Sequence, residues 1–131
     1  MLRIAIIDDD ASHSRAVARL LRASGMEALT YPSAEDYLEG RNGTEADCLV
    51  LDIQLGGMSG FDLHCRLTGA GSPPPIVFLT AHAEPETIAR VVSTGCSYVR
   101  KTDPAQLLLE AIRQAIAAHA LHPTPKGSIT P

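Results

Sequence analysis

Three acidic residues of this chain stand where apolar runs of the sequence end. Asp8 and Asp9 directly follow residues 4–7, and Asp52 lies near the end of residues 48–53. In an open parallel sheet, ligands bind beyond the carboxyl ends of the strands, so these carboxylates converge if the two runs form neighbouring strands. Carboxylates in one pocket repel each other unless a cation lies among them. The pattern favours Mg²⁺, which takes oxygen ligands and usually acts beside a phosphate.

Two later apolar runs end in a hydroxyl and an ammonium group. Thr80 follows the run IVFL, and Lys101 follows SYVR. An ammonium group that faces a metal-bound carboxylate would neutralise the charge of an incoming phosphoryl group, and a hydroxyl would donate a hydrogen bond to it. The set of five residues therefore indicates phosphoryl-group chemistry.

The elements that must position these groups are short strands alternating with helices. Runs rich in Ile, Val and Leu at residues 4–7, 48–53 and 76–79 suit strands buried on both faces, and residues 28–31 and 98–100 are weaker candidates. Five strands that alternate with five helices predict a parallel sheet covered on both sides. The helix start signals lie at Asp10 or Ser12, at Ser33, near Gly60, at Pro85 and at Asp103.

Apolar spacing also predicts which helix residues face the core. The residues expected to pack inward are Ala16, Val17, Leu20, Leu21, Phe61, Leu63, Leu67, Ile88, Val91, Val92, Leu107, Leu108, Ala111, Ile112, Ala115 and Ile116. The five histidines, His13, His64, His82, His119 and His122, show no metal-ligand spacing, and most are interpreted as surface residues.

Length and composition predict one domain, with residues 1–120 as its extent and residues 121–131 as a flexible tail or the start of a linker. No apolar run is long enough to cross a bilayer, and a cytoplasmic location is expected. The net charge of −4 and the absence of Trp argue against a nucleic-acid-binding surface. Cys48, Cys65 and Cys96 lack the spacing of a metal site, so they are expected to be buried free thiols.

The order and spacing of the segments IIDDD, LVLDIQLGGMSG, IVFLTA and GCSYVRK resemble the receiver domains of response regulators in two-component signalling. The resemblance covers about residues 2–120. It implies a doubly wound α/β fold of the CheY-like, flavodoxin-like type. Such a fold is a three-layer sandwich around five parallel strands in the order 2-1-3-4-5.

The same resemblance implies a role for each residue of the acidic pocket. Asp52 would accept a phosphoryl group from a histidine kinase or a histidine phosphotransfer protein. Asp8 and Asp9 would hold Mg²⁺, for which Mn²⁺ can substitute, together with Asp52 and the main-chain carbonyl of Gln54. Asp10 matches no ligand position and is interpreted as a helix cap.

Further residues would carry the switch that follows phosphorylation. Lys101 would pair with the phosphoryl oxygens, Thr80 would move to bond the phosphoryl group, and Tyr98 would turn inward with it. The face formed by the fourth helix, fifth strand and fifth helix would bind a partner or a second copy. Gln54 and His82 would tune the hydrolysis of the acyl phosphate. The protein would then be a signalling phosphoacceptor rather than an ordinary enzyme, one that catalyses its own phosphorylation and slow dephosphorylation.

Two positions depart from the commonest pattern of that family. The loop after the acceptor has Leu55-Gly56 where Met-Pro is usual, followed by Gly57, and is expected to be more flexible. Thr102 follows Lys101 where a proline in a cis peptide is usual, which leaves the geometry of that bond open; a trans bond would allow the lysine to be displaced from the pocket.

Two alternatives to an active receiver follow from the same residues. A pseudo-receiver would keep the fold as a binding or scaffold module that ignores phosphate. The string DDDAS also contains an Asp-x-Asp-x-Ser pattern reminiscent of haloacid-dehalogenase-type phosphatases, but those enzymes need a longer chain and a later acidic pair.

Overall fold

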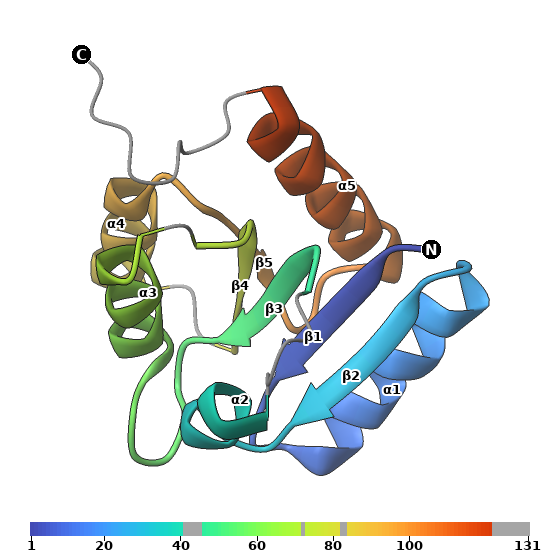
Figure 1. Ribbon diagram of the computed structural model, residues 1–131, viewed down its shortest axis with the longest axis horizontal. Helices are drawn as coiled ribbons and strands as arrows, with labels where there is room; N and C mark the ends of the chain where they lie inside the picture. The colour runs from blue at the N-terminus through green and yellow to red at the C-terminus, as the bar shows by residue number, and fades with distance from the viewer. Residues whose placement is uncertain (41–45, 72, 82–83, 122–131) are drawn as a thin grey trace.

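The computed structural model describes residues 1–40, 46–71, 73–81 and 84–121, and its ribbon is drawn in Figure 1. His82, His122 and the predicted tail beyond residue 121 lie outside the described residues. Strands alternate with helices along the chain. The elements are β1 (Arg3–Ile7), α1 (Ala11–Ala23), β2 (Glu27–Tyr31), α2 (Ala34–Gly40), β3 (Cys48–Asp52), α3 (Gly60–Gly69), β4 (Ile76–Thr80), α4 (Pro85–Thr94), β5 (Ser97–Arg100) and α5 (Ala105–Leu121).

The five strands form one parallel sheet in the order β2-β1-β3-β4-β5, which confirms the predicted fold class. β1 pairs with β3 so that Ile7 lies opposite Leu51. The residues that follow these two positions are Asp8 and Asp52. The register therefore brings the two acids to the same edge of the sheet, at the point where the winding direction of the chain reverses.

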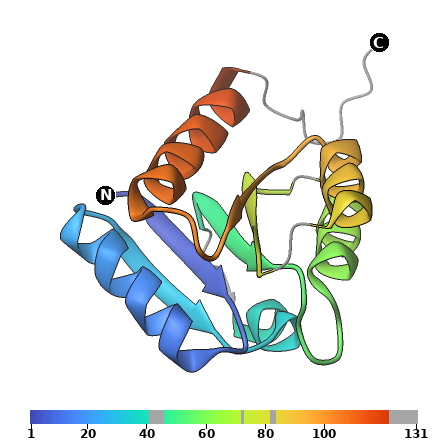
Figure 2. The same ribbon diagram turned by 180° about the vertical axis from the view of Figure 1, so that it is seen from behind.

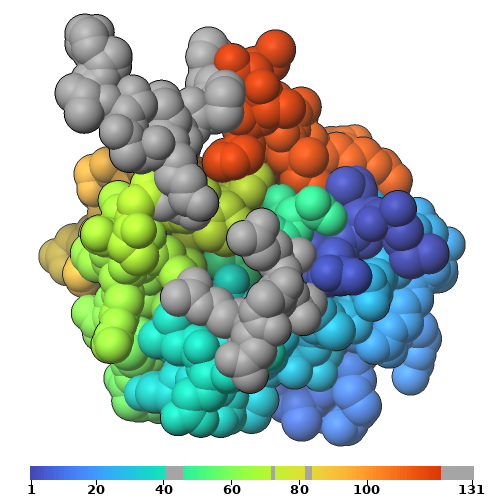
Figure 3. Space-filling view, viewed as in Figure 1, coloured from blue at the N-terminus to red at the C-terminus, as the bar shows by residue number. Residues whose placement is uncertain are grey.

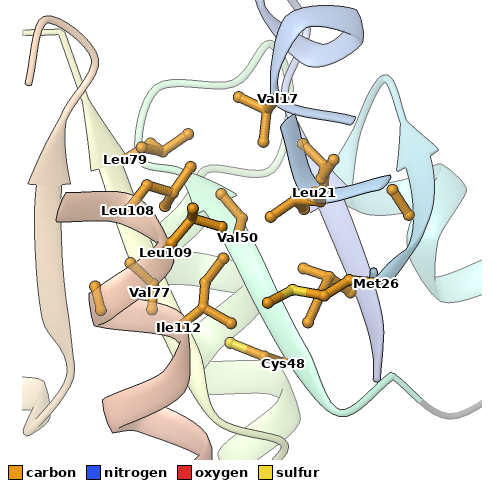
Figure 4. Close-up of a cluster of buried hydrophobic side chains, with 14 of the residues drawn as sticks. Val17, Leu21, Met26, Cys48, Val50, Val77, Leu79, Leu108, Leu109 and Ile112 are labelled. Carbon is orange, nitrogen blue, oxygen red and sulfur yellow. The ribbon is translucent and has the colours of Figure 1, made fainter. Parts of the chain in front are cut away.

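Helices cover both faces of the sheet (Figures 1 and 2). On one face, α1 and α5 pack on side chains from β1, β3, β4 and β5, and Figure 4 shows this cluster around Val50, Leu109 and Ile112. On the other face, α2, α3 and α4 pack on the alternate side chains of the same strands. The space-filling view in Figure 3 shows α2 and α3 covering this second face. β1, β3 and β4 are consequently buried on both sides, as their continuous apolar runs predict.

Local hydrogen bonds set where the helices begin. The Asp10 carboxylate accepts a hydrogen bond from the His13 amide at 3.1 Å and caps α1, as predicted. Ser59 and Asp62 form a reciprocal capping box at the start of α3. α4 begins with Pro85 and ends at Gly95, which has a left-handed φ of +79°.

Three of the predicted inward-facing residues are wrong. Val92 is 66% exposed, Leu107 is 45% exposed and Ala16 is exposed as well. Ala18 and Leu109 are buried in their place, on α1 and α5 respectively. The other predicted residues of these helices are buried or partly buried, so the three exceptions lie at the edges of the predicted stripes, where the position of the sheet decides which residues are covered.

The three cysteines differ in exposure. Cys48 is buried and Cys96 is partly buried, but Cys65 is exposed on α3, so the expectation of three buried thiols is wrong for Cys65. Burial raises the pKa of the Cys48 thiol to about 12, which keeps it protonated and apolar in character. Among the described residues, no helix combines the length and the apolar composition needed to cross a membrane.

Gly60 joins α3 closely to the end of β3, and the structure predicts that this position tolerates no side chain. A Cβ atom at residue 60 would overlap the Asp52 carbonyl oxygen and lie 2.9 Å from the Ile53 Cα. We expect Gly60→Ala to lower the free energy of unfolding by about 1–3 kcal/mol, measured by urea denaturation. Gly69→Ala, at the other end of α3 with open space around it, is the matched control and should leave stability unchanged or raise it by up to about 1 kcal/mol. Equal stability of the two variants would contradict this packing.

Candidate functional site

Three carboxylates meet beyond the carboxyl ends of β1 and β3. Oxygen atoms of Asp8, Asp9 and Asp52 all lie within 4.8 Å of one another. Asp8 and Asp52 are only 2% and 4% exposed, whereas Asp9 is exposed. The convergence expected from the sequence is therefore present, with two acids in the interior and one at the mouth of the pocket.

Asp52 is held at both of its oxygen atoms. Its Oδ1 accepts a hydrogen bond from the Gln54 amide at 3.0 Å, and its Oδ2 accepts one from Lys101 Nζ at 2.8 Å. Burial, helped by the negative charge of Asp8, raises the pKa of Asp52 to about 6. The hydrogen bond from Lys101 acts in the opposite direction and lowers that pKa. The acid therefore loses its proton near neutral pH, and Lys101 keeps the charged form in place.

Asp8 is held by the beginning of α1. Its Oδ1 accepts a hydrogen bond from the Asp10 amide at 2.9 Å, and its Oδ2 lies 2.8 Å from His13 Nδ1. Lys101 Nζ lies 3.3 Å from both oxygens. Burial acts to raise the pKa of Asp8, but the hydrogen bonds from Asp10 and His13 and the Lys101 charge outweigh it and hold that pKa below its usual value. Asp8 is thus ionised at neutral pH.

Lys101 reaches the pocket without a cis peptide. The described peptide bonds are all trans, including Lys101–Thr102, and the lysine is not displaced from the pocket. The Lys101 amide donates to the Thr80 carbonyl at 2.9 Å, which continues the pairing of β4 and β5 by one residue. Asp103 then closes the turn by accepting from the Arg100 amide at 2.9 Å. These two bonds fix the lysine main chain beside the pocket.

The remaining predicted residues lie on or next to the same strand ends. Thr80 is the last residue of β4 and is 4% exposed. Tyr98 is partly buried on β5, opposite Phe78 in the register. Gln54 is exposed and its amide donates to Asp52, while the metal-ligand role of its carbonyl stays a prediction, as do the switch roles of Thr80 and Tyr98.

The loop after Asp52 has a tether of its own. The Met58 amide donates to Glu35 Oε2 at 3.0 Å, which ties the loop to the first turn of α2. Gly57 adopts a φ of +76°, and a Cβ there would lie 2.8 Å from the same Glu35 oxygen. This residue must therefore be glycine in this loop. No motif in the sequence pointed to Glu35.

Sequence reasoning also missed His13. It assigned most histidines to the surface, but the His13 side chain is only 23% exposed and contacts Asp8. A signal was present, because His13 is the third residue after the N-cap Asp10. Side chains of the first turn lean back toward the helix N-terminus, and here that is the end of β1.

The donor set fits a small, hard cation. Carboxylate oxygens are the ligands that Mg²⁺ prefers, and Mn²⁺ accepts the same set. The exposed Asp9 leaves the mouth open to the waters that Mg²⁺ usually retains. The buried pair of carboxylates also has only one ammonium group, Lys101, beside it among the described residues, so a further positive charge would be stabilised there.

A doubly wound parallel sheet with polar groups gathered at its switch point defines the flavodoxin-like class of α/β proteins, which bind their ligands at that point. The profile of the family described as "Response regulator receiver domain" matches residues 4–113, and the chain belongs to this family. The family is part of two-component signalling, and its members generally bind Mg²⁺.

Among characterised relatives, Nodulation protein W of Bradyrhizobium diazoefficiens is 32% identical over 108 residues, which cover 82% of this chain and 48% of the relative. The transcriptional regulatory protein TdiR of Thauera aromatica is 31% identical, with 86% and 50% covered. The chain thus spans about half the length of these curated relatives.

Solved structures agree. A response regulator receiver protein from Burkholderia phymatum is 32% identical with a TM-score of 0.78, covering 89% of this chain and 96% of that one. The response regulator StyR is 36% identical with a TM-score of 0.80, covering 91% and 61%.

The raised pKa of Asp52 predicts a pH-dependent effect on stability. Because this pKa is about 6 in the folded protein against an ordinary 3.8, the folded state binds more protons between these values, and its stability falls as the pH rises through this window. In metal-free solution, Asp52→Asn should therefore exceed wild type in stability by on the order of 1–3 kcal/mol at about pH 7, with little difference near pH 4. Urea denaturation with a chelator measures this.

Glu39→Gln removes an exposed carboxylate from α2 and serves as the control, with the same stability as wild type at about pH 7. If Asp52→Asn were no more stable than wild type at that pH, burial would not be destabilising the ionised form of Asp52.

Proposed function

We propose that this protein is the phosphoacceptor receiver of a two-component phosphorelay. Asp52 accepts a phosphoryl group in the presence of Mg²⁺, and the product is hydrolysed slowly in the same pocket. The observation that carries the proposal is the 2.8 Å contact between Asp52 Oδ2 and Lys101 Nζ beside two further carboxylates. This arrangement offers one nucleophilic oxygen, one cation for the transferred group and an acidic set for the metal.

Each group of the pocket has a chemical task in this proposal. Asp8, Asp9, Asp52 and the Gln54 carbonyl hold Mg²⁺, which supplies charge neutralisation to the transferring group when it is bound. Lys101 orients Asp52 beforehand and afterwards pairs with the phosphoryl oxygens, where negative charge develops. The buried surroundings strengthen both interactions because they lower the local dielectric constant.

Phosphorylation then changes the balance of charge and starts the switch. The phosphoryl group brings roughly two negative charges beside Lys101. We propose that the Thr80 hydroxyl moves to bond it and that Tyr98 turns inward with the shift. Both residues end or lie on strands next to Lys101, whose amide already contacts the Thr80 carbonyl. Gln54 and His82 tune the hydrolysis rate in this proposal.

The phosphodonor is a histidine kinase or a histidine phosphotransfer protein. Arg15 and Arg19 are exposed on α1, the helix that starts at the pocket, and Arg22 completes a basic stripe while donating to the Ala28 carbonyl at 3.0 Å. A basic stripe along the helix that starts at the pocket suits an acidic donor surface. We also propose that the protein is cytoplasmic and that this segment of the chain makes no direct contact with nucleic acid. The output is control of a partner or of an attached effector, and a relative named as a transcriptional regulatory protein supports the second form.

A beryllofluoride experiment distinguishes this function from the pseudo-receiver alternative. Wild-type protein should take up one beryllofluoride, a phosphoryl mimic, only when Mg²⁺ is present, as a bound ¹⁹F NMR signal. Asp52→Asn should lose the signal entirely because the acceptor oxygen is gone. Asp10→Asn, which removes an adjacent charge but keeps an N-capping side chain, should retain it at saturating Mg²⁺. A wild-type protein without any bound signal would favour the pseudo-receiver.

The face formed by α4, β5 and α5 is the proposed output surface. α4 and α5 both contact β5 and flank it in Figure 2. Two large apolar side chains are exposed on these helices, Val92 on α4 and Leu107 on α5. Exposed apolar groups beside a switch strand suit an interface that forms on activation. We propose that this face binds a second copy of the chain.

Val92→Glu tests the dimer. With Mg²⁺ and beryllofluoride, the wild-type protein should shift toward a dimer in sedimentation velocity, and Val92→Glu should weaken that dimer at least tenfold because it places a charge in the interface. Leu2→Glu, a similar change at an exposed apolar residue outside this face, is the control. A wild-type protein that stays monomeric when activated would contradict the proposed dimer.

A further inference from the structure

The imidazole of His13 lies against the most deeply held acid of the pocket. His13 Nδ1 is 2.8 Å from Asp8 Oδ2, and the two side chains are 23% and 0% exposed. No proposed step of phosphoryl transfer uses this histidine. It is not one of the residues whose ligand atoms lie close enough together to share a cation, which are Asp8, Asp9 and Asp52. Its contact with the pocket is therefore made through Asp8.

The direction of this hydrogen bond follows from the state of Asp8. The pKa of Asp8 is held below its usual value, so its carboxylate is ionised at neutral pH and can only accept. His13 Nδ1 must then carry the hydrogen atom and donate it. This requirement makes Nδ1 the donor of the His13–Asp8 hydrogen bond.

The two oxygens of Asp8 are held by two different groups. The Asp10 amide donates to Oδ1 and His13 donates to Oδ2, and both donors belong to the first turn of α1 and its cap. The Lys101 ammonium group approaches from the other side, 3.3 Å from both oxygens. Because Asp10 and His13 hold separate oxygens from the α1 side, together they keep the plane of the carboxylate from turning toward the ammonium group.

Removal of His13 would change what Asp8 contacts. The Lys101 ammonium group already lies 3.3 Å from both oxygens of Asp8, and its shorter contact, 2.8 Å, is with Asp52. Without the histidine, Asp8 could turn further toward Lys101 and away from a metal ion. His13 thus limits the contact between Asp8 and Lys101.

We propose that His13 is a positioning residue that sets the affinity of the pocket for Mg²⁺ by fixing the orientation of Asp8. This inference rests on the proposed function, because it requires Asp8 to be a metal ligand. Partners that hold metal-ligating side chains typically contribute 10–100-fold to metal affinity. We expect about a tenfold effect here, since Asp10 still holds the other oxygen.

The test compares two replacements of the histidine. His13→Leu removes the donor and keeps an apolar side chain of similar size. His13→Asn keeps a donor, because its amide nitrogen reaches about the position of Nδ1. Mg²⁺ dissociation constants come from the titration of backbone amide signals in ¹H–¹⁵N NMR spectra. His13→Leu should weaken Mg²⁺ binding about tenfold, and His13→Asn should remain close to wild type.

His64→Leu is the matched control. It removes a partly buried histidine from α3, where the ring packs near Phe78 away from the acidic pocket. Its Mg²⁺ affinity should equal that of wild type. A long-range ¹H–¹⁵N spectrum of the wild-type imidazole adds a readout that needs no variant. Nδ1 of His13 should be protonated, and its resonance should shift when Mg²⁺ is added.

The outcomes separate this inference from the proposed function. If wild type binds Mg²⁺ and His13→Leu binds it equally well, the positioning role is wrong and the proposed function stands. If His13→Asn is as weak as His13→Leu, or the Nδ1 signal is unprotonated or insensitive to Mg²⁺, the hydrogen bond is not the cause and the inference is overturned. If wild type itself binds no Mg²⁺, the proposed function fails. Should His13→Leu not fold, His13→Asn and the imidazole spectrum still decide.

Discussion

The repulsion between two buried carboxylates is the constraint on which the rest of this structure depends. Asp8 and Asp52 have oxygen atoms within 4.8 Å of each other at positions nearly closed to solvent. Two unit charges at such a distance repel by about 3–4 kcal/mol at an effective dielectric constant of about 20. The fold offsets this repulsion with donors: amides from Asp10 and Gln54, and the Lys101 ammonium group. Burial still raises the pKa of Asp52, whereas the hydrogen bonds to Asp8 hold its pKa below the usual value.

Sheet topology explains why the two carboxylates and the lysine meet at one edge of the sheet. The order β2-β1-β3-β4-β5 makes β1 and β3 neighbours although α1, β2 and α2 lie between them in the chain. Their ends carry the acids, and the loop after β5 carries the lysine. Main-chain hydrogen bonds then hold these groups in position; for example, the Lys101 amide donates to the Thr80 carbonyl. A cation or a phosphoryl group entering this pocket meets side chains that are already oriented, which reduces the reorganisation that binding requires.

The sequence predicted the strands and the positions of Asp8, Asp52 and Lys101 because strands buried on both faces leave continuous apolar runs that end in polar residues. Helix faces were less predictable. Val92 and Leu107 match an apolar stripe, but the sheet covers the neighbouring side of each helix. An apolar residue at the edge of a stripe can lie on either side of that boundary, and sequence spacing does not locate it.

Contacts between secondary-structure elements could not be predicted from the spacing of residues in the sequence. The geometry of the Lys101–Thr102 peptide bond was left open. The local sequence indicates the general preference of a peptide bond, but not the pairing with β4 that fixes the Lys101 main chain. His13 and Glu35 were missed for a related reason. Each is an ordinary first-turn residue whose importance comes from the loop or strand end that it touches. Such tertiary hydrogen bonds have no periodic signature in the chain.

The most direct test of the central claim is to locate the phosphoryl group itself. The protein would be incubated with phosphoramidate, with or without Mg²⁺, and the modified residue would be identified by mass spectrometry after reductive trapping of the acyl phosphate. The account predicts one phosphoryl group per chain, on Asp52 and dependent on Mg²⁺. A chain that gains no phosphoryl group, or carries it on a residue other than Asp52, would contradict it.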